Sequence, residues 1–306
     1  MNIKYNKHYR KALGWINKHF PILIAKMRFK KMFGRKINLK EPKDLNEKIL
    51  WLSLFSDTTE WTRLADKYAV RDFIRERGCE DYLVDLYGKW DSVDEIDWEK
   101  LPNSFVMKTN NGCGTVLLVK EKPSLKHPEI DRKLDYWLHK GMAIATTEFH
   151  YWRIKPCLIA EQLLMPSEDD MKNSSSIVDY KVWCFNGKPQ YIWTVTNRDD
   201  NGFDGALFDT HWNNIPNVIK KNPNIRVPKT LLPKPGKLEL MLEVAKKLSK
   251  GFPEVRVDLY YVNGKVYFGE LTFTCHGGTI DYFIPELLME MGKKIDLSGV
   301  KKIRNR

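Results

Sequence analysis

The segment VRVDLYYVNGKVYFGELTF, residues 255–273, determines the expected fold more than any other stretch. Two runs that alternate apolar and polar residues flank Asn263-Gly264, a pair that favours a two-residue hairpin turn. The segment IVDYKVWCFNGKPQYIWTV, residues 177–195, repeats this pattern around Asn186-Gly187. Because hairpins build antiparallel sheets, these segments predict a layered α+β fold and not a doubly wound parallel sheet.

The arms of the 255–273 hairpin also carry candidate metal ligands. Period-two alternation places Arg256, Asp258 and Tyr260 on one face, and across the turn Glu270 and Thr272 can share that face. Two acids on neighbouring strands with a further oxygen ligand suit Mg²⁺, which takes few protein carboxylates. The alternative is a solvated salt-bridge ladder from Arg256 to Glu270. Apolar flanking residues favour a lined cleft instead.

Outward from these hairpins, apolar spacing predicts further helices and strands. Asp44 is the expected N-cap of a helix, and the Glu47 side chain is expected to reach back to a backbone N–H at the cap. Gly78 predicts the end of a later helix. The expected helices cover part of the first 40 residues with a break at Pro21, then residues 45–55, 59–77, 128–150, 237–250 and 281–291. The expected strands begin near residue 82 and cover 104–108, 115–120 and 157–164.

A glycine loop follows the strand at 104–108. The segment FVMKTNNGCGT, residues 105–115, places Lys108 at the root of a loop that contains Gly112 and Gly114. Glycines let backbone amides approach phosphate oxygens, and the lysine adds a point charge. The segment is not a P-loop, because GxxxxGK[ST] is absent and a strand follows. A glycine hairpin with a surface lysine is the alternative.

Two further segments carry charged residues of interest. Glu161 lies inside the apolar run CLIAEQLL, and a carboxylate within a buried strand usually has a functional role because burying it is costly. Glu168 follows seven residues later. A plain edge-strand glutamate is an equal alternative for Glu161. Lys67 and Arg71 lie one turn apart in ADKYAVRDF, a spacing typical of a solvated helix face.

The 306-residue chain has a net charge of +12, and the excess of positive charge lies at its two ends. Residues 1–40 hold 12 Lys and Arg and no acid, residues 293–306 are also basic, and the body between them is mildly acidic. Such a body makes nucleic acid an unlikely partner, whereas the basic arm suggests an anionic membrane surface or another polyanion. Five scattered cysteines without a CxxC pair predict reduced thiols and a cytoplasmic location, and no apolar stretch approaches a membrane span.

The order of these motifs resembles the ATP-grasp superfamily, which includes D-alanine–D-alanine ligase and glutathione synthetase. The closer resemblance is to its TupA-like branch, named for teichuronopeptide synthesis, and it runs from about residue 36 to 285. It rests on the phrases NLKEPKDLNEKILWL, LADKYAVRDF, YGKWDSVDEIDWEKLPNSFVMK, NGCGT, YKVWCFNGKPQYI and VRVDLYYVNGKVYFGELTF. It implies two α+β lobes that clamp a nucleotide, with ATP and Mg²⁺ as cofactors.

The resemblance also implies roles for individual residues. Contacts to the nucleotide phosphates are implied for Lys67, Lys108 and Lys181, with the loop of Asn111, Gly112 and Gly114 folding over them. Glu161 and Leu163 would belong to the adenine strand, and Glu168 would hold the ribose. Arg256 would stabilise the phosphorylated intermediate, and Asp258, Glu270 and Thr272 would bind Mg²⁺. Many relatives have Asn where this chain has Thr272, which places the geometry of a second metal in question.

The domain division expected on this basis has five parts. They are a basic amphipathic arm (1–40), a helical and strand region (41–103), a small lobe with the glycine loop (104–164), a large catalytic lobe (165–292) and a basic tail (293–306). The implied activity is carboxylate–amine ligation through an acyl phosphate, joining an amino acid or amine to a sugar acid in cell-surface polysaccharide synthesis. The loop at 274–278 places His276 where ligases often seat the acceptor, although a core or turn histidine is the simpler interpretation.

Two other functions fit parts of the sequence. A glycosyltransferase of surface-polysaccharide synthesis is one, but no DxD motif is present, and the lysines are of the ATP-binding type. A polyanion-binding protein without ATP turnover is the other. The arm could also hold the enzyme against lipid-linked glycan precursors at a membrane.

Overall fold

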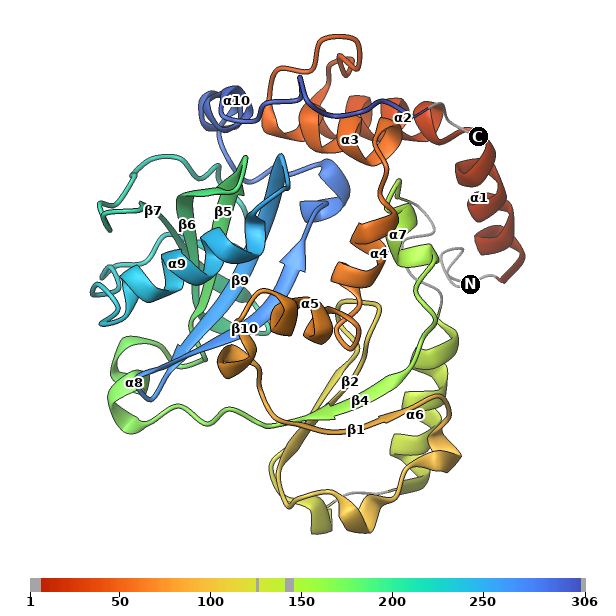
Figure 1. Cartoon of the computed structure of the whole chain (residues 1–306), viewed down its shortest axis with the longest axis vertical. Coiled ribbons are helices and arrows are strands. Elements are labelled where there is room, and N and C mark those ends of the chain that lie inside the picture. The colour runs from red at the N-terminus through yellow and green to blue at the C-terminus, as the bar shows by residue number, and fades with distance from the viewer. Residues whose placement is uncertain (1–6, 125–126, 141–145, 304–306) are drawn as a thin grey trace. The chain divides into compact units, whose positions relative to one another are not determined.

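The chain folds into two compact units, and the computed structural model describes residues 7–124, 127–140 and 146–303 (Figure 1). The large unit comprises Met1–Thr58, Ala143–Phe149 and Pro166–Arg306. The small unit comprises Thr59–Met142 and His150–Met165. Each is described below by itself.

The large unit is built on a six-stranded sheet with the strand order β10-β9-β5-β6-β7-β8. All neighbouring strands are antiparallel except β7 and β8. The strands are β5 (Asp179–Phe185), β6 (Lys188–Asp199), β7 (Gly202–Asp209), β8 (Ile225–Arg226), β9 (Glu254–Val262) and β10 (Lys265–Thr272). Both predicted hairpins are confirmed. Their turns place Asn186-Gly187 and Asn263-Gly264 at positive φ, as a type I′ turn requires.

The two faces of this sheet differ in chemistry. Helix α9 (Leu238–Ser249) packs on β5, β6 and β9 over an apolar face that includes Val182 and Val257. The opposite face carries Trp183 and Trp193, which pack with α3 (Leu45–Phe55) and α10 (Pro285–Lys293). Polar side chains share this second face further along the same strands. The sheet therefore presents a charged patch beside a large aromatic core.

The N-terminal helices belong to the large unit. They are α1 (Lys7–His19), α2 (Pro21–Phe33) and α3, and α8 (Glu168–Asn173) lies later in the same unit. The predicted break at Pro21 is confirmed, since Pro21 opens α2, where its missing N–H costs nothing. Asp44 caps α3 by accepting the N–H of Glu47 at 2.9 Å. Glu47, however, reaches the N–H of Lys43 and not that of the cap residue.

The small unit has a four-stranded antiparallel sheet with the order β1-β4-β2-β3. One face packs on α6 through Leu134, Trp137 and Leu138. The elements are α4 (Thr59–Ala65), α5 (Val70–Glu76), β1 (Leu86–Trp90), β2 (Phe105–Thr109), β3 (Val116–Val119), α6 (His127–His139), α7 (Phe149–Trp152, from His150 onward) and β4 (Leu158–Glu161).

Two of the predicted helices differ from the structure. The helix expected at 59–77 is divided into α4 and α5, because the Asp66 carboxylate accepts the backbone N–H groups of Tyr68 and Ala69 and closes a local turn. In place of the helix expected at 128–150, α6 ends at His139 and the short α7 begins at Phe149, and residues 141–145 lie outside the described residues. No helix in the described part of the chain is long and apolar enough to cross a bilayer.

Candidate functional site

The residues predicted to act on a nucleotide divide into two groups, one on each unit. The small unit carries Lys67, Lys108, Asn111, Gly112, Gly114, Glu161 and Leu163. The large unit carries Glu168, Lys181, Arg256, Asp258, Glu270 and Thr272.

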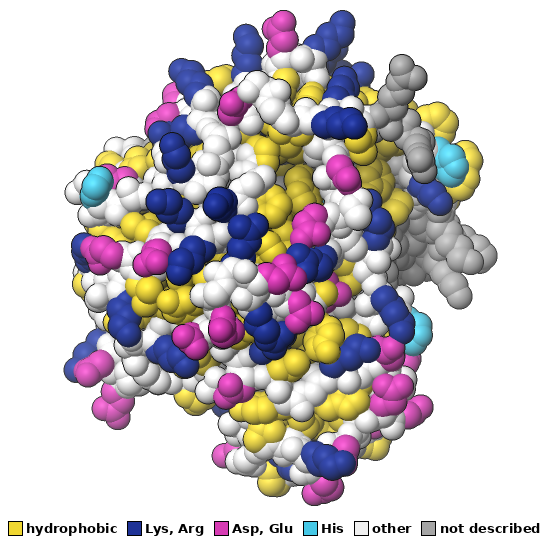
Figure 2. All heavy atoms as spheres, in the orientation of Figure 1, with side chains coloured by type: hydrophobic (Ala, Val, Ile, Leu, Met, Phe, Trp, Pro, Cys, Tyr) yellow, Lys and Arg dark blue, Asp and Glu magenta, His cyan; other side chains and the backbone are white. Residues whose placement is uncertain are grey.

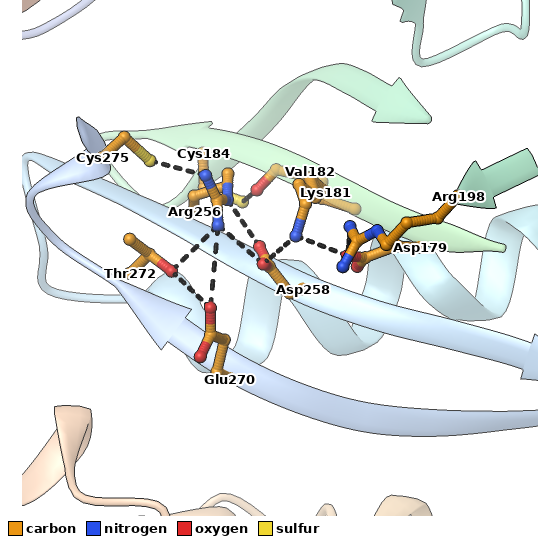
Figure 3. A network of polar contacts seen from close by, with 10 residues as sticks. All are labelled: Asp179, Lys181, Val182, Cys184, Arg198, Arg256, Asp258, Glu270, Thr272 and Cys275. Atoms are coloured by element: carbon orange, nitrogen blue, oxygen red, sulfur yellow. Dashed lines mark hydrogen bonds and ion pairs between the residues drawn. The ribbon is translucent and has the colours of Figure 1, made fainter. Parts of the chain in front are cut away.

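In the large unit, Asp258 lies at the centre of a buried charge network (Figure 3). Arg256 donates to both carboxylate oxygens of Asp258, from Nε to Oδ1 at 2.6 Å and from Nη2 to Oδ2 at 2.7 Å. Lys181 Nζ donates to Oδ2 at 2.6 Å and also pairs with Asp179 at 2.7 Å. Arg256 is only 8% exposed, so the predicted alternative of a solvated ladder is wrong.

The pKa values in this network follow from burial and charge together. Burial acts to raise the pKa of Asp258, but the Arg256 and Lys181 cations outweigh it and hold the pKa below its usual range. Burial acts to lower the pKa of Lys181, and Asp258 and Asp179 more than offset it. For Asp179, burial dominates and raises the pKa. Asp258 therefore stays ionised between two protonated cations.

A β-bulge sets the position of Glu270. Along β9 and β10 the pairing shifts by one residue between Phe268 and Glu270, so that Glu270 lies directly opposite Asp258. A Cβ at Gly269 would come within 3.1 Å of the Asp258 carbonyl oxygen, so glycine suits the bulge. The shift brings Glu270 within 3.8 Å of Arg256. It also places Thr272 opposite Arg256, whose Nη2 donates to the Thr272 hydroxyl at 3.2 Å.

Arg198, Asp179 and Cys275 belong to this network and were not predicted from the sequence, and Arg198 Nη2 lies 3.4 Å from Asp179 Oδ2. Arg256 Nη1 donates to the sulfur of buried Cys275 at 2.8 Å, and burial raises the pKa of that thiol. Asp179 is the second partner of Lys181. Asp179 and Lys181 alternate along β5 as Arg256 and Asp258 do along the neighbouring β9, so the sequence pattern could have identified Asp179 as a member of the network. No such pattern marks Cys275.

The donor set of Asp258, Glu270 and Thr272 fits Mg²⁺. Two carboxylates and a hydroxyl are hard oxygen ligands, and few protein ligands suffice when phosphate oxygens complete the shell. Within residues 7–124, 127–140 and 146–303 no group of three or more His, Cys, Asp or Glu side chains could hold a metal ion by itself. Because Asp258 already neutralises two cations, Glu270, with its side chain 40% exposed, is the more accessible carboxylate.

In the small unit, Glu161 is the buried carboxylate. It pairs with Lys108 on the neighbouring strand β2 and with Arg71 Nη1 of α5 at 3.5 Å. Strand β4 lies between β1 and β2, so the alternative of an edge-strand glutamate is wrong. Arg71 is 7% exposed and donates to the Val84 carbonyl at 2.8 Å, which corrects the prediction of a solvated helix face.

The glycine loop is anchored at its root and exposed at its tip. Asn110 is buried. Its side-chain amide donates to the Asp66 carboxylate at 2.8 Å, and its backbone carbonyl accepts the backbone N–H of Lys67 at 2.9 Å. Lys67 lies in the turn between α4 and α5, and its Nζ donates to the Gly112 carbonyl at 2.7 Å. Gly114 is exposed, with φ +72 and open space around its Cβ position. Lys67 is therefore part of the loop's own support.

Other predicted residues lie apart from these two networks. Leu163 is half-buried beyond the end of β4, and Asn111 is buried in the loop. Glu168 is exposed in the first turn of α8, which Ser167 caps. His276 is exposed in a turn at φ 51, with its ring 5.1 Å from that of Tyr282, so it is a turn histidine and not a core one.

The family of the chain follows from a comparison of its sequence with protein-family models. Its sequence matches the model of the TupA-like ATP-grasp family over residues 47–296, and it belongs to that family. The α+β architecture is accordingly an ATP-grasp fold. No curated protein matches the chain.

Several solved structures are similar to the chain. D-alanine–D-alanine ligase from Bacillus anthracis shows 15% identity and a TM-score of 0.44, over 78% of this chain and 66% of that one. The ligase from Helicobacter pylori shows 14% and 0.43, over 82% and 69%. The ATP-grasp ligase PsnB with its minimal precursor shows 11% and 0.39, over 75% and 60%. The chain spans less than two thirds of the first and third of these proteins.

Proposed function

We propose that this protein is an ATP-dependent carboxylate–amine ligase that joins an amino acid or amine to a sugar acid during cell-surface polysaccharide synthesis. The observation that carries the proposal is the family match over residues 47–296. Among the similar structures are a D-alanine–D-alanine ligase complexed with ATP and an ADP complex of N5-carboxyaminoimidazole ribonucleotide synthetase. The sugar acid and the polysaccharide rest on the TupA-like branch.

The large-unit network supports a role in phosphoryl transfer. Arg256 is held by contacts to Asp258, Thr272 and Cys275, so its guanidinium is oriented before any ligand arrives. A preoriented cation stabilises charge on a transferring phosphoryl group without reorganisation during the reaction. We assign Arg256 to the phosphorylated intermediate and Lys181 to a nucleotide phosphate.

When bound, Mg²⁺ would neutralise phosphate charge and orient the γ-phosphoryl group. Asp258, Glu270 and Thr272 are the residues that would hold it. Their hydroxyl and carboxylates already contact one another or Arg256, so the donors are gathered on one face of β9 and β10.

The small-unit residues are assigned to the rest of the nucleotide. Lys108 lies at the root of the glycine loop, with its side chain 18% exposed, and we assign it and Lys67 to phosphates. Asn111, Gly112 and Gly114 would cover them. Glu161 and Leu163 would form the adenine strand, and Glu168 of the large unit would accept from the ribose.

In the proposed reaction, a carboxylate oxygen attacks the γ-phosphorus of ATP, ADP leaves, and an acyl phosphate forms. An amine then attacks the acyl carbon, and phosphate departs as the amide bond forms. No side-chain nucleophile is required, which suits a site composed of cations and metal-binding oxygens.

The test is a screen of uronic acids crossed with amino acids and simple amines, read by phosphate release and product mass. We expect at least one pair to give ADP, phosphate and an amide in equal amounts, and Glu270→Gln to abolish this turnover. A nucleoside diphosphate released from a sugar donor, without ATP consumption, would establish a glycosyltransferase instead. Stable folding of the Gln variant, checked by circular dichroism, is the control.

A further inference from the structure

Helices α1 and α2 expose large apolar side chains on a surface that their own unit does not cover. Trp15 is 58% exposed, Phe20 51%, Leu23 52% and Met27 59%. The ring of Trp15 lies 6.3 Å from that of Phe20 in an edge-on arrangement. Exposed apolar residues that occur singly need no explanation, but a contiguous group of them indicates an interaction site.

Helix α2 has two apolar faces, and only one is used within the unit. Ala25 and Phe29 are buried against Leu50 and Leu54 of α3. Residues three, four and seven apart lie on one face of a helix, so Leu23 and Met27 share a face that also includes Phe20. Turned away from the core, that second apolar face has no structural role within the unit.

Lysines border this second face. Lys26, Lys30 and Lys31 of α2 are all exposed, and no acid in the described part of the chain pairs with any of them. At the right edge of Figure 2, where Figure 1 places α1, yellow apolar side chains lie close to a dark-blue basic one. We call Trp15, Phe20, Leu23 and Met27, with these three lysines, the arm face.

We propose that the arm face docks the protein on an anionic lipid bilayer. Apolar side chains that enter the headgroup region, flanked by lysines that meet anionic lipid, are the two components of interfacial attachment. The attachment lies outside the ligase reaction and is independent of its substrates.

The charge of this region disfavours the other occupants. Residues 1–40 contain no acid, so a second copy that made contact through the same arm face would bring lysines against lysines. A nucleic acid would satisfy the lysines but would leave Leu23 and Met27 exposed or packed against phosphates. A bilayer satisfies both components at once.

The experiment is co-sedimentation of the full-length protein with vesicles of phosphatidylcholine alone or mixed with phosphatidylglycerol. We expect binding to the mixed vesicles only, weakened as salt shortens the screening length from ~10 Å at 0.1 M. Leu23→Ser with Met27→Ser should weaken binding on the order of tenfold or more, since buried apolar area is lost. Lys30→Gln with Lys31→Gln should weaken it as well and reduce its salt dependence.

Matched controls use equally exposed residues of the same unit. Val227, which is 71% exposed, is changed to Ser, and Lys229 with Lys246 to Gln. These variants should bind as the parent protein does. Equal binding to both vesicle types, or unchanged binding by the Leu23 and Met27 variant, would overturn the proposal. Light scattering that shows a dimer of the parent protein but a monomer of the Leu23 and Met27 variant would also overturn it. Binding to RNA without binding to vesicles would do the same.

Discussion

Asp258 in the large unit and Glu161 in the small unit are buried carboxylates that are each held by two cations, and the two arrangements differ in where the cations originate. Asp258 is held by Arg256 and Lys181, which lie on its own strand and on the adjacent one. Glu161 is held by Lys108 of the same sheet and by Arg71 of a separate helix. The first network therefore belongs to one sheet face, and the second also joins a helix to a sheet.

This difference separates two tasks of buried charge. Arg256 makes two hydrogen bonds to Asp258 and further contacts to Thr272 and Cys275, so its orientation is determined by its surroundings. Lys108 is a point charge that can exchange one oxygen for another without losing a geometric match. We interpret Arg256 as a preoriented cation and Lys108 as an exchangeable one.

The largest expected effect is that of Asp258→Asn, which leaves Arg256 and Lys181 buried without their shared counterion. Breaking a buried ion pair from one side costs about 3–5 kcal/mol of unfolding free energy. Urea denaturation measures it. The matched control is Glu270→Gln, whose partly exposed carboxylate lies 3.8 Å from Arg256 and should cost less than about 1 kcal/mol. Equal losses in the two variants would contradict the central position of Asp258.

The difference in stability between the parent protein and Asp258→Asn should depend on pH. Because Arg256 and Lys181 hold the pKa of Asp258 down, its ionised form stabilises the fold above the ordinary carboxyl pKa of about 4. This stabilisation is lost as the pH falls through the lower pKa of the folded state. The stability gap between the parent protein and Asp258→Asn should therefore narrow below about pH 4. A constant gap across that range would contradict the assignment.

Arg71→Met should have a smaller effect, because Glu161 keeps Lys108 as a partner. The lost pair and the unsatisfied Val84 carbonyl should together cost about 1–3 kcal/mol in urea denaturation. Arg75→Met, on the same helix and exposed, serves as the control and should change stability by less than about 0.5 kcal/mol. A loss for Arg71 as small as that for Arg75 would show that α5 is not tied to the sheet through this ion pair.

Lys108→Ala should weaken ATP binding about tenfold or more, which corresponds to about 1.4 kcal/mol. Titration calorimetry with ATP and Mg²⁺ measures this affinity. Lys120→Ala, an exposed lysine just beyond β3 in the same unit, should leave it unchanged. Unaltered affinity in both Lys108→Ala and Lys67→Ala would rule out their phosphate roles.

Thr272→Asn should have the smallest effect. The amide keeps an oxygen donor at a position opposite Arg256 and supplies the residue type that the resemblance to the ATP-grasp superfamily implies there. We expect the Mg²⁺ concentration for half-maximal turnover to stay the same or to fall. A large rise would mean that the Thr272 hydroxyl is needed to hold Arg256 and is not interchangeable with another oxygen.

The hairpins, their Asn-Gly turns and the Asp44 cap were predictable because each depends on neighbours in sequence. The bulge at Gly269 depends on how two strands align, and only a glycine inside a strand pattern hinted at it. The burial of Arg71 depends on Glu161, 90 residues later in the chain, and periodicity within one helix carries no such information. Cys275 was missed because no feature of the sequence separates a cysteine whose sulfur accepts a hydrogen bond from arginine from an ordinary buried cysteine.

The central claim, carboxylate activation through an acyl phosphate, is tested most directly by isotope transfer. The carboxylate substrate found in the screen is labelled with ¹⁸O in both carboxyl oxygens and turned over with unlabelled ATP and the amine. Our account predicts that each released phosphate carries one ¹⁸O and that the amide retains the other. Unlabelled phosphate formed together with the amide would contradict it.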